Sequence, residues 1–218
     1  MNEKLKLLAS ELEGQLHYDV TTRTLYATDA SAYREMPMAV AIPASIKDLR
    51  TLIDFANKEH TSLIPRTAGT SLAGQVVGNG IIVDVSKNFT KILELNTEQG
   101  WVRVQPGVIR DELNLFLKPH GLFFGPETST ANRAMIGGMV GNNSCGSNSI
   151  VYGSTREHLL EVKALLSDGS AVEFKQVGID EFHRLCEGPY FENRVYRNIR
   201  SLLGNYETQV EIRKEFPK

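Results

Sequence analysis

Residues 65–75, which read PRTAGTSLAGQ, have the composition of a loop that binds an anion. Small residues placed directly after a strand let consecutive backbone N–H groups turn toward one point and form a concave anion site. The hydroxyls of Thr70 and Ser71 add donors, and Arg66 adds a positive charge. A diphosphate needs many donors at close backbone approach, so this segment predicts a diphosphate site. On composition alone, a flexible turn without a ligand is an equal alternative.

Two well-known phosphate loops do not fit this segment. Gly69 and Gly74 have the spacing of a P-loop, but Gln75 and Val76 stand where that loop needs Lys and then Ser or Thr. Nucleoside triphosphate hydrolysis is therefore not expected. The G-x-G-x-x-G fingerprint of the Rossmann fold is also absent, and its nearest echo, at residues 137–141, has the wrong spacing.

A second segment, residues 126–153, is too long for a simple connection and has small residues at its centre. Its glycines would let a planar ligand approach the main chain, and its Asn and Ser side chains supply both donors and acceptors. Between Ser129 and Gly153 the only charged residue is Arg133. That composition suits an uncharged ring or a diphosphate better than a metal ion.

Five motifs follow one another in a fixed order along the chain. They are Pro65–Gln75, Ile136-Gly-Gly138, Asn142–Gly146, Tyr152-Gly153 and Asp168-Gly169. This order resembles the flavin-binding domain of the FAD-linked oxidases typified by vanillyl-alcohol oxidase. Within them, the chain is most similar to the branch of D-lactate dehydrogenase and glycolate oxidase. The resemblance covers roughly residues 36–172.

The resemblance implies an α+β fold, the two-lobed FAD-binding domain of the vanillyl-alcohol oxidase (PCMH) type, with FAD held between the lobes. We assign residues 1–35 to an N-terminal helix and loop, 36–96 to the first lobe and 97–218 to the second, with the boundary near Asn96 placed at a shift between the two halves of the sequence. The family's domain continues into a third segment that contacts the cofactor, followed by a substrate domain. Neither is found before Lys218. We therefore expect an N-terminal fragment of a longer flavoenzyme, truncated before the last segment of its flavin domain.

The resemblance also implies which residues contact the cofactor, with residues 66–72 around the pyrophosphate. The full set is Pro65, Arg66, Thr67, Ala68, Gly69, Thr70, Ser71, Leu72, Ser129, Thr130, Ile136, Gly137, Gly138, Asn142, Asn143, Ser144 and Gly146. Some relatives attach FAD covalently through a histidine in the first loop. Thr70 stands at the matching position, so we expect non-covalent FAD.

By the same resemblance, the full-length parent would be an FAD-dependent oxidoreductase that oxidises a small D-2-hydroxy acid of the D-lactate or glycolate type. Relatives take most catalytic acid and base residues from the substrate domain, so no catalytic residue is assigned here. The fragment alone is expected to hold FAD weakly and to be inactive. Larger enzymes of this branch carry an iron–sulfur cluster in a C-terminal part; whether the parent has one there stays open, and the electron acceptor stays unassigned.

The residues leave two alternative functions open. The first is a non-catalytic module that binds nucleotides or phosphate, which keeps the loop arguments without redox chemistry. The second is a flavin reductase of cell-wall precursor synthesis, which the Tyr152-Gly153 context disfavours.

Composition excludes several other classes. The 218 residues are 41% hydrophobic and 23% charged, with a net charge of −2 and no run of Lys or Arg, so nucleic acid is not an expected partner. Cys145 and Cys186 form no disulfide or zinc pattern, and the five histidines form no metal motif. No stretch is apolar enough for a transmembrane helix. These features predict a cytoplasmic protein, or one peripheral to the inner face of a membrane.

Periodicity predicts the elements that must position the two glycine-rich segments. Leu5, Leu8 and Leu12 have helical spacing, and Ser45-Ile-Lys-Asp48 is a capping box that begins a second helix. Expected strands are residues 39–42, 62–65, 81–85, 91–95 and 101–105, with a helix over 108–117, a hairpin over 160–174 and helical tendency after residue 180. Residues 19–36 and 125–153 are expected to be loops.

Overall fold

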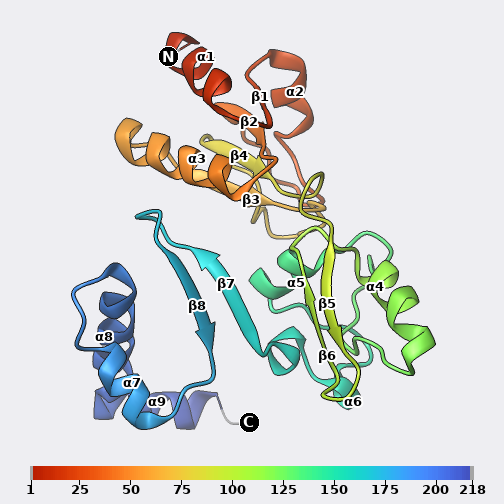
Figure 1. The fold of residues 1–218 in the computed structure, drawn as a ribbon, viewed down its shortest axis with the longest axis vertical. Coiled ribbons are helices and arrows are strands. Elements are labelled where there is room, and N and C mark those ends of the chain that lie inside the picture. Colours follow the sequence, from red (N-terminus) through yellow and green to blue (C-terminus); the bar gives the residue numbers. More distant parts are fainter. Residues whose placement is uncertain (1, 217–218) are drawn as a thin grey trace. The chain divides into compact units, whose positions relative to one another are not determined.

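The computed structural model describes residues 2–216 (Figure 1). The chain forms two compact units, the first ending at Leu159 and the second beginning at Leu160. The boundary predicted near residue 96, which separates the two proposed lobes, lies inside the first unit and stays a prediction.

A four-stranded sheet organises the N-terminal half of the first unit. Its spatial order is β1-β2-β4-β3. The strands are β1 (Gln15–His17), β2 (Ala39–Ile42), β3 (Leu63–Arg66) and β4 (Ile81–Asp84). Strands β2 and β3 both run parallel to β4 and flank it, as the strand–helix–strand pattern predicts, while β1 is antiparallel to β2. The first glycine-rich segment therefore leaves the sheet at the carboxyl end of β3.

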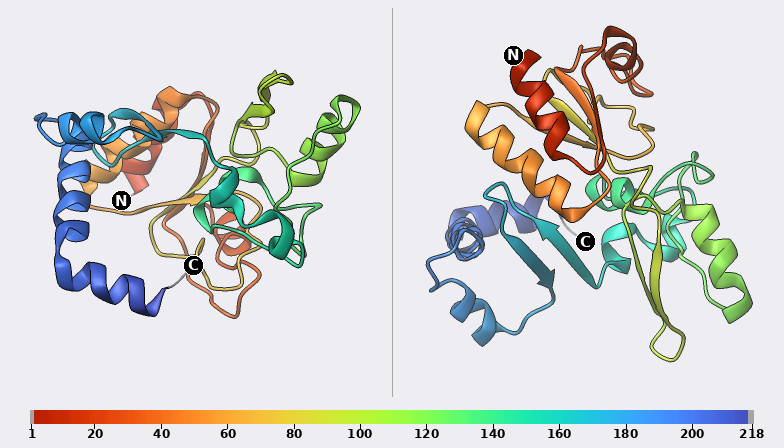
Figure 2. Two further views of the ribbon diagram at one scale, coloured as in Figure 1. Left: turned by 90° about the horizontal axis from the view of Figure 1, so that it is seen from below. Right: turned by 45° about the horizontal axis from the view of Figure 1, so that its top comes forward.

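Helices α1 (Asn2–Glu11) and α3 (Ile46–Glu59) pack side by side on this sheet (Figure 2). Leu5 and Leu8 of α1, and Leu12 just after its end, are buried against Leu52 of α3 and against β2 and β4. The shared cluster consists of Leu5, Leu8, Leu12, Ala39, Ala41, Leu52, Ile81 and Val83. Both helix predictions are confirmed.

Asp48 joins these elements through its buried carboxylate. It accepts hydrogen bonds from the backbone N–H groups of Glu13 (2.8 Å), Gly14 (2.9 Å) and Ala44 (2.8 Å). Burial acts to raise the pKa of Asp48, but these donors outweigh it, and the pKa lies below its usual value. The hydroxyl of Ser45 caps the same helix by accepting from the N–H of Asp48 at 3.3 Å.

The prediction of a loop over residues 19–36 is wrong in part, because Val20–Leu25 form helix α2. The carboxylate of Asp19 accepts from the N–H of Thr22 at 2.9 Å and so caps the helix. The short strand β1 was not predicted either. Its three residues are too few to produce a periodic pattern.

The remainder of the first unit is built on the antiparallel pair β5 (Ile92–Asn96) and β6 (Trp101–Val104), followed by α4 (Arg110–Leu117) and a 3-10 turn over Lys118–His120. Val108, Leu113 and Leu117 form its buried cluster, against which Ile136 packs. The prediction that residues 125–153 are a loop is wrong in part. This segment contains the short helices α5 (Ile136–Gly141) and α6 (Ser149–Tyr152), and a 3-10 turn over Thr155–His158 follows.

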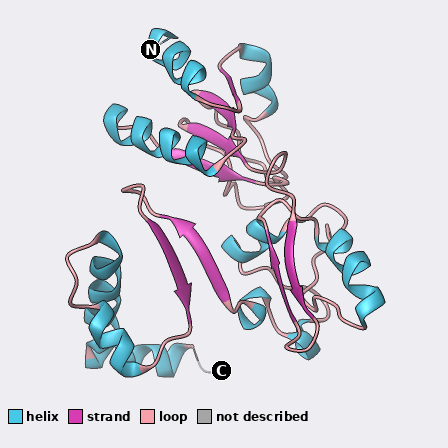
Figure 3. Cartoon of the chain, viewed as in Figure 1, coloured by secondary structure: helices cyan, strands magenta, loops and turns pink. Residues whose placement is uncertain are grey.

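The second unit begins with the antiparallel hairpin β7 (Glu161–Leu165) and β8 (Ala171–Lys175), which confirms the hairpin prediction (Figure 3). Three helices follow: α7 (Ile179–Leu185), α8 (Phe191–Gly204) and α9 (Tyr206–Glu215). Phe182 meets Tyr196 edge-on, with ring centroids 5.8 Å apart, and joins α7 to α8. Among residues 2–216, none of the helices combines the length and apolar character needed to cross a bilayer.

Candidate cofactor site

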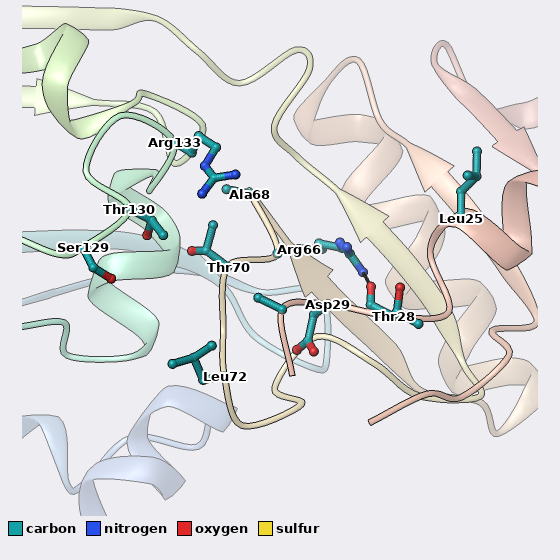
Figure 4. A pocket seen from close by; sticks show the side chains of 12 residues that line it. Leu25, Thr28, Asp29, Arg66, Ala68, Thr70, Leu72, Ser129, Thr130 and Arg133 are labelled. Carbon is teal, nitrogen blue, oxygen red and sulfur yellow. Dashed lines mark hydrogen bonds between the residues drawn. The ribbon is translucent and has the colours of Figure 1, made fainter. Parts of the chain in front are cut away.

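An open cleft of about 390 Å³ lies within the first unit. Three stretches of chain that are distant in sequence contribute its walls. The lining residues are Leu25, Thr28, Asp29, Ala30, Arg66, Ala68, Gly69, Thr70, Leu72, Ser129, Thr130 and Arg133. In Figure 4, Arg133, Thr130 and Ser129 lie on one side of Thr70, while Arg66, Asp29 and Thr28 lie on the other.

Arg66, the last residue of β3, supplies one of the two arginines of the cleft. Its Nη1 donates to the carbonyl oxygens of Thr28 (2.9 Å) and Tyr26 (3.3 Å), and its guanidinium carbon lies 5.1 Å from the centroid of the Tyr26 ring. A guanidinium stacked on an aromatic ring and bonded to fixed carbonyls loses little further freedom when it meets an anion. The N-terminal segment therefore positions the arginine that the sequence placed in the anion loop.

Tyr26 is held in place by a hydrogen bond to a residue of the sheet. Its hydroxyl donates to Oδ2 of Asp84 at 2.5 Å, and Oδ1 of Asp84 accepts from the N–H of Ser86 at 2.8 Å. Burial, and then the hydrogen bond to the Asp84 carboxylate, raise the pKa of Tyr26 above its usual value. Tyr26 is thus a neutral donor at all physiological pH values.

Gly69 makes the close turn of the first glycine-rich segment. Its φ is +66°, and a Cβ built on it would lie 2.6 Å from a guanidinium nitrogen of Arg66. A side chain here would be strained and would also collide with that arginine. The carbonyl of Gly69 accepts from the N–H of Ala30 at 3.2 Å, which ties the loop to the N-terminal segment.

The two glycine-rich segments lie against each other. A Cβ on Gly138 would approach Oγ1 of Thr67 to 2.6 Å, so the absence of a side chain allows this contact. The side chain of Gln75 bridges the same two segments, because its Nε2 donates to Oδ1 of Asn142 at 2.9 Å. The two segments are therefore in contact in the fold, although Thr67, Gly138 and Asn142 do not line the cleft.

Several predicted site residues of the second segment hold that segment in shape instead of lining the cleft. Asn143 has a φ of +46°, and its Oδ1 accepts from the hydroxyl of Ser154 and the N–H of Arg156, each at 2.9 Å. Ser144 is buried, and its carbonyl accepts from the hydroxyl of Thr155 at 2.7 Å. Ile136 packs in the apolar cluster near α4.

The predicted residues thus divide into two groups. Those that line the cleft are Arg66, Ala68, Gly69, Thr70, Leu72, Ser129 and Thr130. Those that lie outside its lining are Pro65, Thr67, Ser71, Ile136, Gly137, Gly138, Asn142, Asn143, Ser144 and Gly146. Contact of either group with a cofactor stays a prediction.

Five lining residues were absent from the predicted set: Leu25, Thr28, Asp29, Ala30 and Arg133. Arg133 carried a signal, because it is the only charge between Ser129 and Gly153. Residues 25–30 carried none, because their place beside Gly69 and Arg66 depends on long-range contacts.

The chemistry of the lining fits a large, anionic and partly apolar ligand. Arg66 and Arg133 supply positive charge, and Thr70, Ser129 and Thr130 supply hydroxyls. Leu25 and Leu72 are 70% and 79% exposed, so the cleft also offers apolar surface that a ligand ring could cover. Within the described part of the chain, no group of three or more His, Cys, Asp or Glu side chains could hold a metal ion.

Comparison with known proteins identifies the ligand class. The family described as "FAD binding domain" matches residues 37–175. The chain belongs to this family. FAD is therefore its cofactor, as the order of the motifs predicts, and the fold is the FAD-binding fold of the vanillyl-alcohol oxidase type.

Individual relatives agree with this membership in the FAD binding domain family. A D-2-hydroxyglutarate dehydrogenase of Pseudomonas putida is 41% identical over 213 residues, which cover 96% of this chain and 21% of the relative. The mitochondrial cytochrome-type D-lactate dehydrogenase of Kluyveromyces lactis is 32% identical over 162 residues, covering 72% of this chain and 28% of the relative. A solved alkyldihydroxyacetonephosphate synthase shares the fold, with a TM-score of 0.72 at 19% identity, over 84% of this chain and 37% of the other.

The chain spans about a fifth of the length of the D-2-hydroxyglutarate dehydrogenases that it matches, 21% in the Pseudomonas putida protein. The resemblance to the D-lactate dehydrogenase branch is confirmed. The family match begins at residue 37, so the segment that supplies Leu25, Thr28, Asp29 and Ala30 lies outside it.

Proposed function

We propose that the cleft binds FAD non-covalently, with the pyrophosphate facing Arg66, Arg133 and the backbone of residues 67–72. The observation that carries this proposal is the contact between the two glycine-rich segments beside an arginine fixed by Tyr26 and Thr28. Thr70 lines the cleft. By the family resemblance it stands where some relatives carry the histidine that bonds FAD, and a threonine hydroxyl does not form that bond.

The chain would serve as the FAD-binding part of an enzyme that oxidises a small D-2-hydroxy acid. Bound FAD would supply the acceptor for a hydride, which carries both electrons, from the hydroxy acid carbon, and this chain's residues would hold and orient FAD. The names of the relatives, which include D-2-hydroxyglutarate and D-lactate dehydrogenases, support that substrate class. No acid or base is assigned among the described residues, and the electron acceptor is not assigned either.

We also propose a cytoplasmic location. Cys145 and Cys186 are both unpaired, and Cys145 is exposed. Exposed free thiols persist best in a reducing compartment. Fractionation of cells that express the tagged chain would test this, since recovery in a membrane or secreted fraction would contradict it.

Titration of the purified chain with FAD, followed by flavin fluorescence, tests the binding proposal. Parallel titrations use FMN, ADP and inorganic pyrophosphate, each up to millimolar concentration. The proposal predicts that FAD binds more tightly than any of the three, because FAD alone combines a diphosphate with the isoalloxazine ring: FMN lacks the diphosphate, and ADP and pyrophosphate lack the ring. Equal affinity for ADP and FAD would instead support a nucleotide-binding or phosphate-binding module, and no binding of FAD would overturn the proposal.

Turnover needs a separate measurement. Reduction of a dye acceptor is followed with D-2-hydroxyglutarate, D-lactate or glycolate, using the chain saturated with FAD. We expect no turnover by the chain alone, and turnover by a longer polypeptide that continues past Lys218. A longer polypeptide that binds FAD and oxidises none of the three acids would contradict the proposed substrate class.

A further inference from the structure

Asp29 carries an acceptor atom that the protein itself leaves unsatisfied. Its Oδ1 accepts from the N–H of Ser31 at 2.8 Å. Its Oδ2 is buried and, among the described residues, is the one buried side-chain nitrogen or oxygen without a hydrogen-bond partner. Buried polar atoms of native proteins are almost always paired, so an unpaired one calls for a specific cause.

This carboxylate belongs to the wall of the cleft. Asp29 lines it between Thr28 and Ala30, and Figure 4 shows it between Thr28 and Thr70. The backbone around it is held at both sides, since the carbonyl of Thr28 accepts from Arg66 and the N–H of Ala30 donates to Gly69. The carboxylate therefore has a fixed place beside the anion loop.

Arg66, which lines the same cleft, does not satisfy Oδ2. The Nη1 of Arg66 is directed to the carbonyl oxygens of Tyr26 and Thr28. A carboxylate repels phosphate, so within FAD the group that would pair with Oδ2 is a neutral donor. Among the parts of FAD, hydroxyls of the ribityl chain and of the ribose are donors of that kind.

We propose that Asp29 is a cofactor-binding residue whose Oδ2 accepts a hydrogen bond from a sugar hydroxyl of FAD. The proposal rests on the proposed function of the cleft. It assigns a ligand contact to a segment that precedes the family match at residue 37. In this proposal the carboxylate and the arginines bind different parts of FAD: the carboxylate accepts a hydrogen bond from a hydroxyl, while Arg66 and Arg133 face the phosphates.

The substitution Asp29→Asn tests the contribution of Oδ2 alone. The amide keeps an oxygen for the N–H of Ser31 but replaces Oδ2 with an NH₂ group, which cannot accept. We expect the Kd for FAD to rise about tenfold or more, since hydrogen bonds to charged groups are among the stronger ones. Without FAD, the midpoint of thermal unfolding is expected to be unchanged or higher, because the variant no longer buries an unpaired charge.

Ser31→Ala is the matched control. It removes the hydroxyl that accepts from the N–H of Tyr33 at 3.1 Å in the same turn and leaves the Asp29 carboxylate intact. Its Kd for FAD is expected to equal that of the wild type. If Ser31→Ala and Asp29→Asn weaken FAD binding equally, the effect comes from the shape of the turn, and the inference is wrong.

Competition with FAD separates the two possible hydroxyl sources. Weaker binding of riboflavin by Asp29→Asn, with ADP unchanged, identifies the ribityl chain, and the reverse result identifies the ribose. An unchanged Kd for FAD in Asp29→Asn overturns the inference while the proposed function stands. A wild-type chain that does not bind FAD overturns both.

Discussion

Arg66 and Asp84 are register partners on the parallel strands β3 and β4, and both are joined to Tyr26. The guanidinium of Arg66 stacks on the Tyr26 ring and donates a hydrogen bond to the backbone carbonyl of Tyr26. The carboxylate of Asp84 accepts a hydrogen bond from the Tyr26 hydroxyl. One tyrosine from the N-terminal segment thus links a buried carboxylate of the sheet to the arginine of the cleft. The link gives the cleft a rigid wall on the side of the sheet.

Tyr26→Phe is expected to lower the free energy of unfolding by about 1–3 kcal/mol, because it leaves the buried Asp84 carboxylate with one donor fewer. Urea unfolding followed by circular dichroism measures the change. Tyr33→Phe is the control, since Tyr33 is 62% exposed. An equal stability of Tyr26→Phe and the wild type would show that the hydroxyl contributes nothing to the fold.

Asp48 gives stability a defined dependence on pH. Its pKa in the folded state lies below the usual value of about 4, so its contribution is complete above about pH 4 and is lost as the pH falls through the folded pKa. Asp48→Asn is expected to destabilise the chain by about 2 kcal/mol or more at pH 7, and by less as the pH falls below 4. Urea unfolding from pH 3 to 7 tests this. The control is Asp54→Asn on the exposed side of the same helix, and a penalty for Asp48→Asn that does not vary with pH would refute the role of the charge.

Gly138→Ala tests the contact between the glycine-rich segments. The new Cβ would meet Oγ1 of Thr67 at 2.6 Å, which predicts a loss of stability of about 1–3 kcal/mol. Adding Thr67→Ala removes the obstructing hydroxyl, so the double variant should recover most of that loss. Gly141→Ala, on the same helix but with no atom within 4 Å of its Cβ, should be neutral or slightly stabilising. Additive effects of the Gly138 and Thr67 substitutions would show that the two residues do not meet.

Arg133→Gln tests whether the cleft recognises a diphosphate. The loss of one positive charge should raise the Kd for FAD and for ADP about tenfold, and riboflavin, which has no phosphate, should bind as before. The effect should shrink at high salt, because Arg133 is exposed and its charge is screened. Arg50→Gln, an exposed arginine on α3, is the control. A similar loss of riboflavin binding would contradict a role in binding phosphate.

The elements with a strong apolar pattern could be predicted from the sequence. The leucines of α1, the capping box of α3 and the apolar run of β4 each produce a local signal. Helix α2 has no apolar stripe, and its start depends on the single cap of Asp19. Helix α5 reads IGGMVG, a composition with low helix propensity, and it forms where Ile136 packs against a buried cluster.

Residues of the site could be predicted only where the composition of their own loop indicates a binding site. Gly69, Thr70 and Arg66 stand in a run of small residues after a strand, and they do line the cleft. Thr28 and Asp29 reach the same cleft because Ala30 pairs with Gly69 across some 40 positions of sequence. A contact of that separation leaves no local pattern in the chain.

The packing of α1 has a consequence for how a minimal domain should be delimited. The boundaries of the family match, residues 37–175, would leave out α1 and the buried Leu5, Leu8 and Leu12. The apolar surface of Leu52 and of the inner strands, which α1 covers, would then be exposed to water. An exposed apolar surface of this kind promotes aggregation. A shortened polypeptide that begins at residue 37 would therefore be expected to precipitate on expression. The truncation removes part of the hydrophobic core and also the residues before 37 that line the cleft.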